Sequence, residues 1–310
     1  MFVSRKLQTK ILSSGLINLP VVEVWSKAAV GTYLWQHILE GEESLDETVP
    51  GATLGELRMP AFILRYRSGP GVTPDSVPRD MKNVVLVVNG RTEEKVTDAK
   101  YWLDSIQSWD TPPVVILVML GNEQCENHWV DGYIQPNGPV VTVLVTYDDP
   151  RVDQVTFYQW PLGVLKIMSP YRIIVNCIYC TTHNTTPTRD FLVYFTTSTH
   201  RWLPNETVES MEDYVRSLLQ SDLSLCPAGM NTETYRVYEA LSAGSTPIIE
   251  DVAIKGQCDS QPWRLLKRHG PPVIWVKTWE QLPKILAKER RYVILCTALT
   301  VKRGMRDRII

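Results

Sequence analysis

The segment from Ser221 to Val252 carries charged side chains in an order that suits the binding of a nucleotide diphosphate. Arg236 and Glu239 stand three positions apart in a helix predicted over 233–243, so both side chains lie on one face of that helix. The guanidinium of Arg236 presents a fork of donors that suits a diphosphate. The carboxylate of Glu239 can accept two hydrogen bonds from a diol such as a ribose. The start of the helix, near Thr232, adds free N–H groups and the positive end of the helix dipole.

Two predicted strands bracket this helix. The strand over 222–226 leads into a turn-rich loop with Gly229, and the strand over 246–250 ends in Glu250. Ligands bind at the carboxyl ends of strands in an open α/β sheet, so the loop and Glu250 join the candidate ligand site. The alternative, from spacing alone, is a surface ion pair between the same Arg and Glu side chains, with Glu250 in a strand-end turn.

The elements that would position this site belong to an alternating pattern that runs along the chain. Runs of β-branched residues at 84–88 and 114–120 predict strands buried on both faces, and 140–147 predicts a third strand. Apolar residues at helical spacing predict a helix over 92–109. Strand, helix and strand in this order favour parallel βαβ units.

The second half repeats the pattern. Its further predicted elements are a helix over 207–219 capped by Asn205 or Thr207, a chain reversal at Gly244 after the helix over 233–243, a short helix over 262–269, a strand over 273–276 and a helix from 278. We therefore expect two α/β halves, with their boundary near 160–170, where Pro161, Gly163 and Pro170 fall.

Composition excludes several classes of protein. The chain has 310 residues, a formal net charge of −2 and 44% hydrophobic residues, which rules out a polybasic nucleic-acid binder. Ten Trp and thirteen Tyr argue against disorder, and no run of about 18 apolar residues predicts a membrane span. A third interpretation, an unrelated α/β binder of NAD or ATP, is disfavoured because the chain has neither G-x-G-x-x-G nor a P-loop sequence.

The motif around Arg236 resembles one found in exostosin-like glycosyltransferases. The shared pattern is a strand, a Cys-Pro-x-Gly loop, an Arg-x-Tyr-Glu-Ala helix and a Gly-x-x-Pro-Ile/Val strand. Long blocks in the right order are similar to the ribitol-phosphate xylosyltransferases of that family: Val24–Gly41, Asn83–Arg91, Leu120–Trp129, Tyr158–Val164 and Ser221–Asp251.

The resemblance implies a fold and an activity. The fold would be α/β and GT-B-like, with two Rossmann-like domains facing a cleft: an acceptor-side domain over 1–165 and a nucleotide-sugar-binding domain over 166–310. The activity would be transfer of xylose from UDP-xylose, in β1,4 linkage, to ribitol 5-phosphate on the O-mannosyl glycan of α-dystroglycan. The resemblance also implies fukutin and the fukutin-related protein as partners, a type II membrane protein of the Golgi, and no metal or other cofactor.

This chain departs from the family pattern in three places. It begins just ahead of the block at Val24, so we expect a partial chain without the membrane anchor of the family. The resemblance fails over 166–201 and again over 290–310. The alternative function is therefore a non-catalytic fragment that binds nucleotide sugar or partner glycosyltransferases.

The implied reaction inverts the anomeric centre and needs one general base. Glu123, after the strand over 114–120, is the first candidate, and Asp148 and Asp149 come second. The alternative for each is a loop carboxylate that caps or solubilises. The candidate phosphate contacts are Arg189, Lys27, Arg91 and His128, each of which could equally be a bystander.

A luminal location has further consequences for the chain. Asn184 and Asn205 lie in N-glycosylation sequons. Cys226 and Cys258 each follow a strand on the donor side and could form a disulfide, the alternative being two free thiols.

Overall fold

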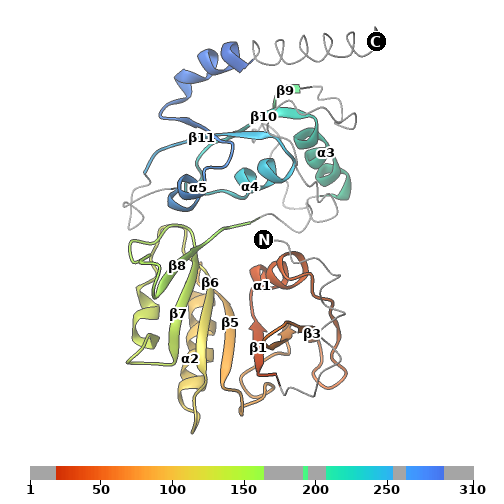
Figure 1. The fold of residues 1–310 in the computed structure, drawn as a ribbon, viewed down its shortest axis with the longest axis vertical. Coiled ribbons are helices and arrows are strands. Elements are labelled where there is room, and N and C mark those ends of the chain that lie inside the picture. The colour runs from red at the N-terminus through yellow and green to blue at the C-terminus, as the bar shows by residue number, and fades with distance from the viewer. Residues whose placement is uncertain (1–18, 164–190, 195–206, 254–262, 290–310) are drawn as a thin grey trace. The chain divides into compact units, whose positions relative to one another are not determined.

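The computed structural model describes residues 19–163, 191–194, 207–253 and 263–289. The chain separates into two compact units (Figure 1). The first comprises the residues up to 146 together with 151–160, and the second comprises 147–150 with the residues from 161 onward. Each unit has its own sheet with helices packed against it, which confirms the predicted α/β class.

The first unit is built on an eight-stranded sheet in the order β2-β3-β4-β1-β5-β6-β7-β8. Its strands are β1 (Val21–Ser26), β2 (Ser44–Leu45), β3 (Thr53–Arg58), β4 (Ile63–Ser68), β5 (Asn83–Asn89), β6 (Val114–Leu120), β7 (Val140–Thr146) and β8 (Phe157–Trp160). All neighbours from β4 to β8 pair in parallel, whereas β2–β3 and β3–β4 pair antiparallel. The carboxyl ends of six strands therefore share one edge.

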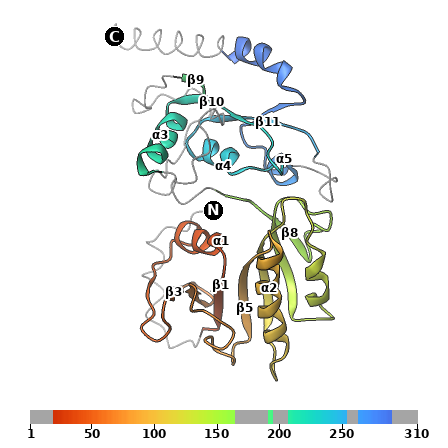
Figure 2. The same ribbon diagram turned by 180° about the vertical axis from the view of Figure 1, so that it is seen from behind.

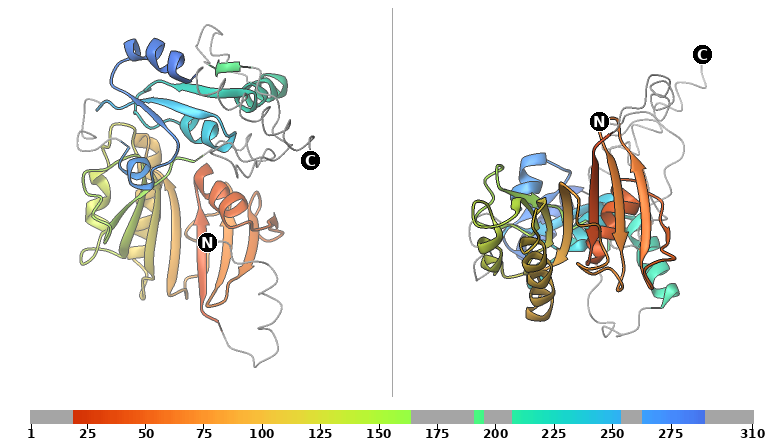
Figure 3. Two further views of the ribbon diagram at one scale, coloured as in Figure 1. Left: turned by 45° about the horizontal axis from the view of Figure 1, so that its top comes forward. Right: turned by 90° about the horizontal axis from the view of Figure 1, so that it is seen from below.

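Helix α2 (Glu93–Gln107) covers one face of this sheet, as Figure 2 and the right view of Figure 3 show. Thr92 caps it by accepting a hydrogen bond from the Lys95 N–H at 3.4 Å. Its apolar stripe, with Trp102 and Leu103 at most 1% exposed, packs into the same core as the strands. The shorter helices of this unit are α1 (Ala29–Tyr33), which continues as a π-helical turn (Leu34–Ile38), and a 3₁₀ helix (His128–Tyr133).

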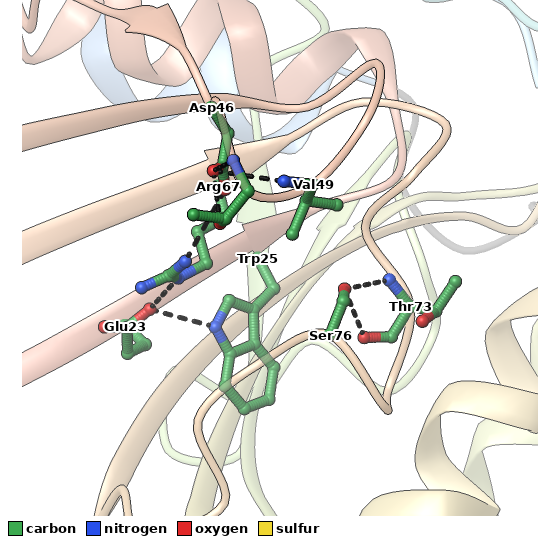
Figure 4. Close-up of polar contacts among 8 residues, drawn as sticks. Glu23, Trp25, Asp46, Val49, Arg67, Thr73 and Ser76 are labelled. Atoms are coloured by element: carbon green, nitrogen blue, oxygen red, sulfur yellow. Dashed lines mark hydrogen bonds and ion pairs between the residues drawn. The ribbon is translucent and has the colours of Figure 1, made fainter.

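Strand β1 carries a buried carboxylate. Glu23 is fully buried, and its Oε2 accepts hydrogen bonds from Trp25 Nε1 at 3.1 Å and from Arg67 Nε of β4 at 3.0 Å (Figure 4). Arg67 also lies 4.0 Å from Asp46. A buried charge is tolerated only when it is paired and hydrogen-bonded, so these contacts are what allow Glu23 inside the sheet. They also cross-link β1 to β4.

The second unit is built on a four-stranded parallel sheet in the order β12-β11-β10-β9. The strands are β9 (Phe191–Tyr194), β10 (Ser221–Cys226), β11 (Thr246–Glu250) and β12 (Ile274–Val276). The helices are α3 (Val208–Leu219), α4 (Tyr235–Ser242), α5 (Arg264–His269), a 3₁₀ turn (Trp279–Gln281) and a helix over 282–289. Within the described ranges, no helix has the length and apolar character needed to cross a bilayer.

Two helix ends of this unit agree with the sequence prediction. Thr207 caps α3 with a capping box, in which its Oγ1 accepts from the Ser210 N–H while Ser210 Oγ accepts from the Thr207 N–H. Gly244 ends the turn after α4 with φ +73°, a left-handed conformation that favours glycine.

Candidate active site

The loop between β10 and α4 lies at the carboxyl end of the second sheet and is tied to the neighbouring strand. Glu250, the last residue of β11, accepts a hydrogen bond from the Ala228 N–H at 3.2 Å. The exposed Gly229 donates its N–H to the Asn231 carbonyl at 3.0 Å, which closes the turn. Glu250 therefore holds the loop in place, a role close to the strand-end turn of the alternative interpretation.

The start of α4 is enclosed by protein. Thr232 and Glu233 are 4% and 5% exposed, and Asn231 Oδ1 accepts the Glu233 N–H at 2.9 Å. Thr234 precedes the helix with extended φ and ψ but makes no side-chain cap, and its buried Oγ1 has no hydrogen-bond partner in the described part of the chain. First-turn N–H groups carry a partial positive charge, so this end of α4 can receive an anion.

Arg236 and Glu239 both project from α4, but Glu239 is not a surface residue. Its side chain is 3% exposed, and its Oε2 accepts a hydrogen bond from the Tyr214 hydroxyl of α3 at 2.5 Å. Arg236 is half-buried, and its Nε is buried without a hydrogen-bond partner among the described residues. The alternative of a surface ion pair therefore fails for Glu239.

The electrostatics of this cluster follow from burial. Burial and then the Glu239 charge raise the pKa of Tyr214 above its ordinary value, and the Arg236 charge opposes them. Burial raises the pKa of Cys226 to about 12, against an opposing effect of Arg236. Because one cation and one carboxylate influence both groups, the strand end and the two helices α3 and α4 form one charged cluster.

Of the two alternatives for Cys226, a disulfide with Cys258 or a free thiol, the structure has the free thiol. Cys226 is a free, fully buried thiol whose Sγ contacts the Ser224 carbonyl at 3.6 Å. It packs in the core with Val237 of α4 and Ile249 of β11. Cys125 is disulfide-bonded, which its neighbouring residues in the sequence do not predict. Cys258 lies outside the described residues.

In the first unit, Glu123 and Arg91 form an ion pair beyond the ends of β6 and β5. The Glu123 side chain remains 24% exposed, so a substrate hydroxyl could reach it. The preceding Gly121 N–H donates to Thr146 Oγ1 at 2.9 Å, which fixes the start of the loop on β7. The ammonium of Lys27 donates to the carbonyls of residues 69 and 72, so it has structural partners already.

Asp148 and Asp149 follow β7 and group with the second unit. Asp148 is 6% exposed and lies 3.3 Å from Nε of Arg264, the first residue of α5. Asp149 is 1% exposed. Arg264 was not singled out from the sequence, because a lone Arg at a short helix start has no distinguishing pattern.

The remaining predicted site residues have simpler outcomes. His128 contacts Asp131, with its Nδ1 3.2 Å from Oδ2. Arg189, Asn184 and Asn205 lie outside the described residues. No group of three His, Cys, Asp or Glu side chains in the described ranges could hold a metal ion.

Comparisons with known proteins agree on one family. Residues 22–161 match the family model described as RXYLT1 N-terminal domain, and residues 186–303 match RXYLT1 C-terminal domain. The match therefore extends over 186–201 and 290–303, where the resemblance was expected to fail. The chain is 37% identical over 302 residues to a Danio rerio protein named ribitol-5-phosphate xylosyltransferase 1, an alignment that covers 87% of this chain and 69% of that protein. Identity to the Homo sapiens protein of the same name is 35% over 310 residues, covering 88% and 69% of the two chains.

Proposed function

Because the chain belongs to the ribitol-5-phosphate xylosyltransferase family, we propose that it transfers xylose from UDP-xylose to ribitol 5-phosphate. We further propose that the xylose is attached in β1,4 linkage and that the ribitol is carried on the O-mannosyl glycan of α-dystroglycan in the Golgi lumen. We include fukutin and the fukutin-related protein as partners, and a GT-B arrangement of the two α/β units.

The observation that carries the proposal is the set of polar atoms at the start of α4. Arg236 Nε and Thr234 Oγ1 are buried yet have no hydrogen-bond partner within the described residues. Buried polar groups are nearly always paired, so two unpaired groups at one helix start are what a site for a polar ligand requires. A diphosphate supplies acceptors for both, and the uncapped helix start adds to the attraction.

Different protein groups act on the nucleotide-sugar donor and on the acceptor. Arg236 and the first-turn N–H groups of α4 stabilise the charge that develops on the departing UDP. Glu239 receives the ribose hydroxyls, and Tyr214 orients the Glu239 carboxylate through their 2.5 Å hydrogen bond. No metal ion is part of this proposal.

Glu123 is the proposed general base, ahead of Asp148 and Asp149. The Glu123 side chain is 24% exposed, whereas Asp148 is 6% and Asp149 1% exposed, and a base must come within hydrogen-bond reach of the acceptor hydroxyl. Arg91 fixes the direction of the Glu123 carboxylate. The proton of the attacking hydroxyl passes to Glu123 as the bond from oxygen to the anomeric carbon forms and the bond from that carbon to UDP breaks.

The deciding experiment is transfer itself. Purified chain is incubated with UDP-xylose and a ribitol-5-phosphate acceptor, with UDP-glucose and UDP-galactose in parallel, and mass spectrometry detects an added pentose. Arg236→Ala should reduce transfer by about 10²–10³-fold, the scale for removing one donor that stabilises a developing charge. Arg216→Ala, which removes an exposed Arg from neighbouring α3, is the matched control. UDP binding without transfer by the wild type would identify a non-catalytic binding protein instead.

A further inference from the structure

The first unit contains a hollow of about 730 Å³ at the carboxyl ends of β1 and β4. One wall is the turn after β1, a second is the end of β4 with Gly69, and the third is one face of α2. Its volume lies within the range of small-molecule sites, roughly 300–1,000 Å³. None of the residues proposed above to bind the nucleotide sugar lines it.

The hollow lies where the chain connections of the sheet diverge. Strand β1 has β4 on one side and β5 on the other, and its last residue pairs with the last residue of β4, Ser26 with Ser68. From β1 the chain proceeds through β2 and β3 to β4, and from β5 it proceeds in the opposite direction to β6, β7 and β8. The strand ends beside such a divergence are where α/β sheets bind ligands.

The walls are held by specific contacts. Lys27 Nζ donates to the Gly69 carbonyl at 3.3 Å and to the Val72 carbonyl at 3.0 Å, which fastens the turn after β4 to the turn after β1. Gly69 has φ +123°, and a Cβ there would lie 2.1 Å from the Gly51 carbonyl oxygen. The Glu23–Arg67 ion pair cross-links the same two strands (Figure 4). The hollow is therefore formed before any ligand arrives, which lowers the entropic cost of binding.

The lining suits a polyhydroxylated ligand with a negative charge. Asp98 and Tyr101 are both exposed on the α2 wall, with Tyr101 50% exposed, and hydroxyls of Thr32 and Ser68 are nearby. A carboxylate accepts hydrogen bonds from neighbouring hydroxyls, and an aromatic ring covers the C–H face of a carbohydrate. Lys27 Nζ keeps one N–H beyond the two that donate to carbonyls, and Lys95 Nζ lies 3.2 Å from the Glu94 carboxylate on the same wall. These two ammonium groups supply the positive charge for a phosphate.

The hollow is also near the proposed base. Glu123 follows β6, and β6 is two strands from β1 along the same edge. Neighbouring strands are about 4.8 Å apart, so the two strand ends are separated by about 10 Å. A sugar alcohol held in the hollow could therefore extend a hydroxyl toward Glu123.

We propose that this hollow binds the acceptor by its sugar-alcohol phosphate, with Tyr101 against the carbon chain, Asp98 accepting hydroxyl hydrogen bonds and Lys27 with Lys95 facing the phosphate. The inference rests on the proposed function, because that function names the acceptor. It adds the place where the acceptor lies and the residues that select it.

The test uses the whole chain and measures binding separately from turnover. Ribitol 5-phosphate binding is measured by calorimetry and by saturation-transfer NMR, and acceptor KM is measured in the transfer assay. Tyr101→Ala and Asp98→Asn should each raise the acceptor Kd and KM by about tenfold or more, the scale of one hydrogen bond to a charged group or one stacked ring. Lys100→Ala and Glu93→Gln, exposed α2 residues outside the hollow, are the matched controls and should match wild type. UDP binding, measured in parallel, reports whether the fold is intact.

The outcomes separate the two proposals. Ribitol 5-phosphate binding that Tyr101→Ala and Asp98→Asn weaken supports the hollow, even if the wild type transfers no xylose and the proposed function fails. Normal transfer with acceptor Kd and KM within twofold of wild type in both variants overturns the hollow and leaves the function standing. Absence of ribitol 5-phosphate binding by the wild type overturns the inference.

Discussion

Tyr214→Phe is expected to destabilise the second unit by about 2 kcal/mol, because it deletes the hydroxyl that donates to Glu239 and retains the ring. The hydrogen bond is 2.5 Å long and its acceptor is a carboxylate that is 3% exposed. A hydrogen bond to a charged group contributes about 1.5–3 kcal/mol, and a buried acceptor left unpaired costs a similar amount. The partial exposure of Tyr214 favours the lower part of that range.

The measurement has to be local, since two units need not unfold together. Hydrogen–deuterium exchange of peptides from 207–253 reports the opening free energy of α3, β10 and α4. A loss of about 2 kcal/mol corresponds to roughly 30-fold faster exchange in those peptides, at 1.36 kcal/mol per tenfold. Urea unfolding should show a midpoint lower by about 1 M for a slope near 2 kcal/mol per M.

A matched control exists in the first unit. Tyr133 donates to Asp104 at 2.7 Å, but both groups are at the surface, so Tyr133→Phe should cost less than about 1 kcal/mol. The double variant Tyr214→Phe with Glu239→Gln measures the coupling, expected at about 1–2 kcal/mol. Equal costs for Tyr214→Phe and Tyr133→Phe, or a coupling below about 0.5 kcal/mol, would refute the reasoning.

Three further experiments test separate parts of the molecule. Glu123→Gln should lower transfer by about 10²-fold or more, as expected on losing a general base, and leave UDP affinity unchanged. Glu126→Gln in the same loop is the control and should leave transfer unchanged. Weakened UDP binding by Glu123→Gln would contradict the assignment of Glu123 as the base. Cys226, whose pKa burial raises to about 12, should resist iodoacetamide at pH 8 until the protein is denatured, and labelling of the native protein would disprove its burial. The hydrogen bonds from Thr48 hold the pKa of Asp46 below its ordinary value of 3.8. The Asp46 carboxylate therefore stabilises the folded state above pH 3.8, and this stabilisation is lost as the pH falls through the pKa of the folded state. The Tm difference between wild type and Asp46→Asn should therefore shrink below about pH 4, and a constant difference would count against it.

Much of the parallel part of the fold could be predicted from local patterns. The strands over 114–120 and 246–250 have the predicted bounds, and α2 lies within its predicted range of 92–109. The predictions for these segments are confirmed because continuous β-branched runs and helical spacing of apolar residues are local signals. The capping of α3 by Thr207 belongs to the same class of signal.

Strands β1–β4, β8 and β9 were not predicted, and in β1, β3 and β4 charged residues are the reason. β1 includes Glu23 and β4 includes Arg67, which break the apolar pattern of each strand. Glu23 and Arg67 form an ion pair across the sheet, so the charge in each strand is explained only when the neighbouring strand is known. Local patterns cannot show a pairing between residues 44 positions apart, so tertiary contacts override the propensity here.

The same limit applies to the candidate active site. Arg236 and Glu239 could be found from their spacing in one helix, but Tyr214 comes from a different helix 25 positions earlier. A Tyr in an amphipathic helix is usually a core aromatic, and the residues around it do not distinguish a hydrogen-bond donor. Arg264 is missed for the same reason, since its partner Asp148 lies more than a hundred positions before it in the sequence.

Among the buried glutamates of the described residues, Glu23 and Glu239 differ in a way that bears on function. Glu23 Oε2 accepts hydrogen bonds from an indole N–H and a guanidinium of its own sheet, whereas its Oε1 is buried without a hydrogen-bond partner in the described residues. The guanidinium of Arg67 pairs the charge of Glu23, which gives this carboxylate a structural explanation. Glu239 lies beside unpaired polar atoms at the start of α4, where Arg236 Nε and Thr234 Oγ1 are buried without hydrogen bonds in the described ranges. Burying a charge is costly, and each buried donor left without an acceptor adds a cost of its own. A stable fold keeps such a cluster where a ligand completes it, which is why the start of α4, and not the Glu23 network, is the place to look for the nucleotide sugar.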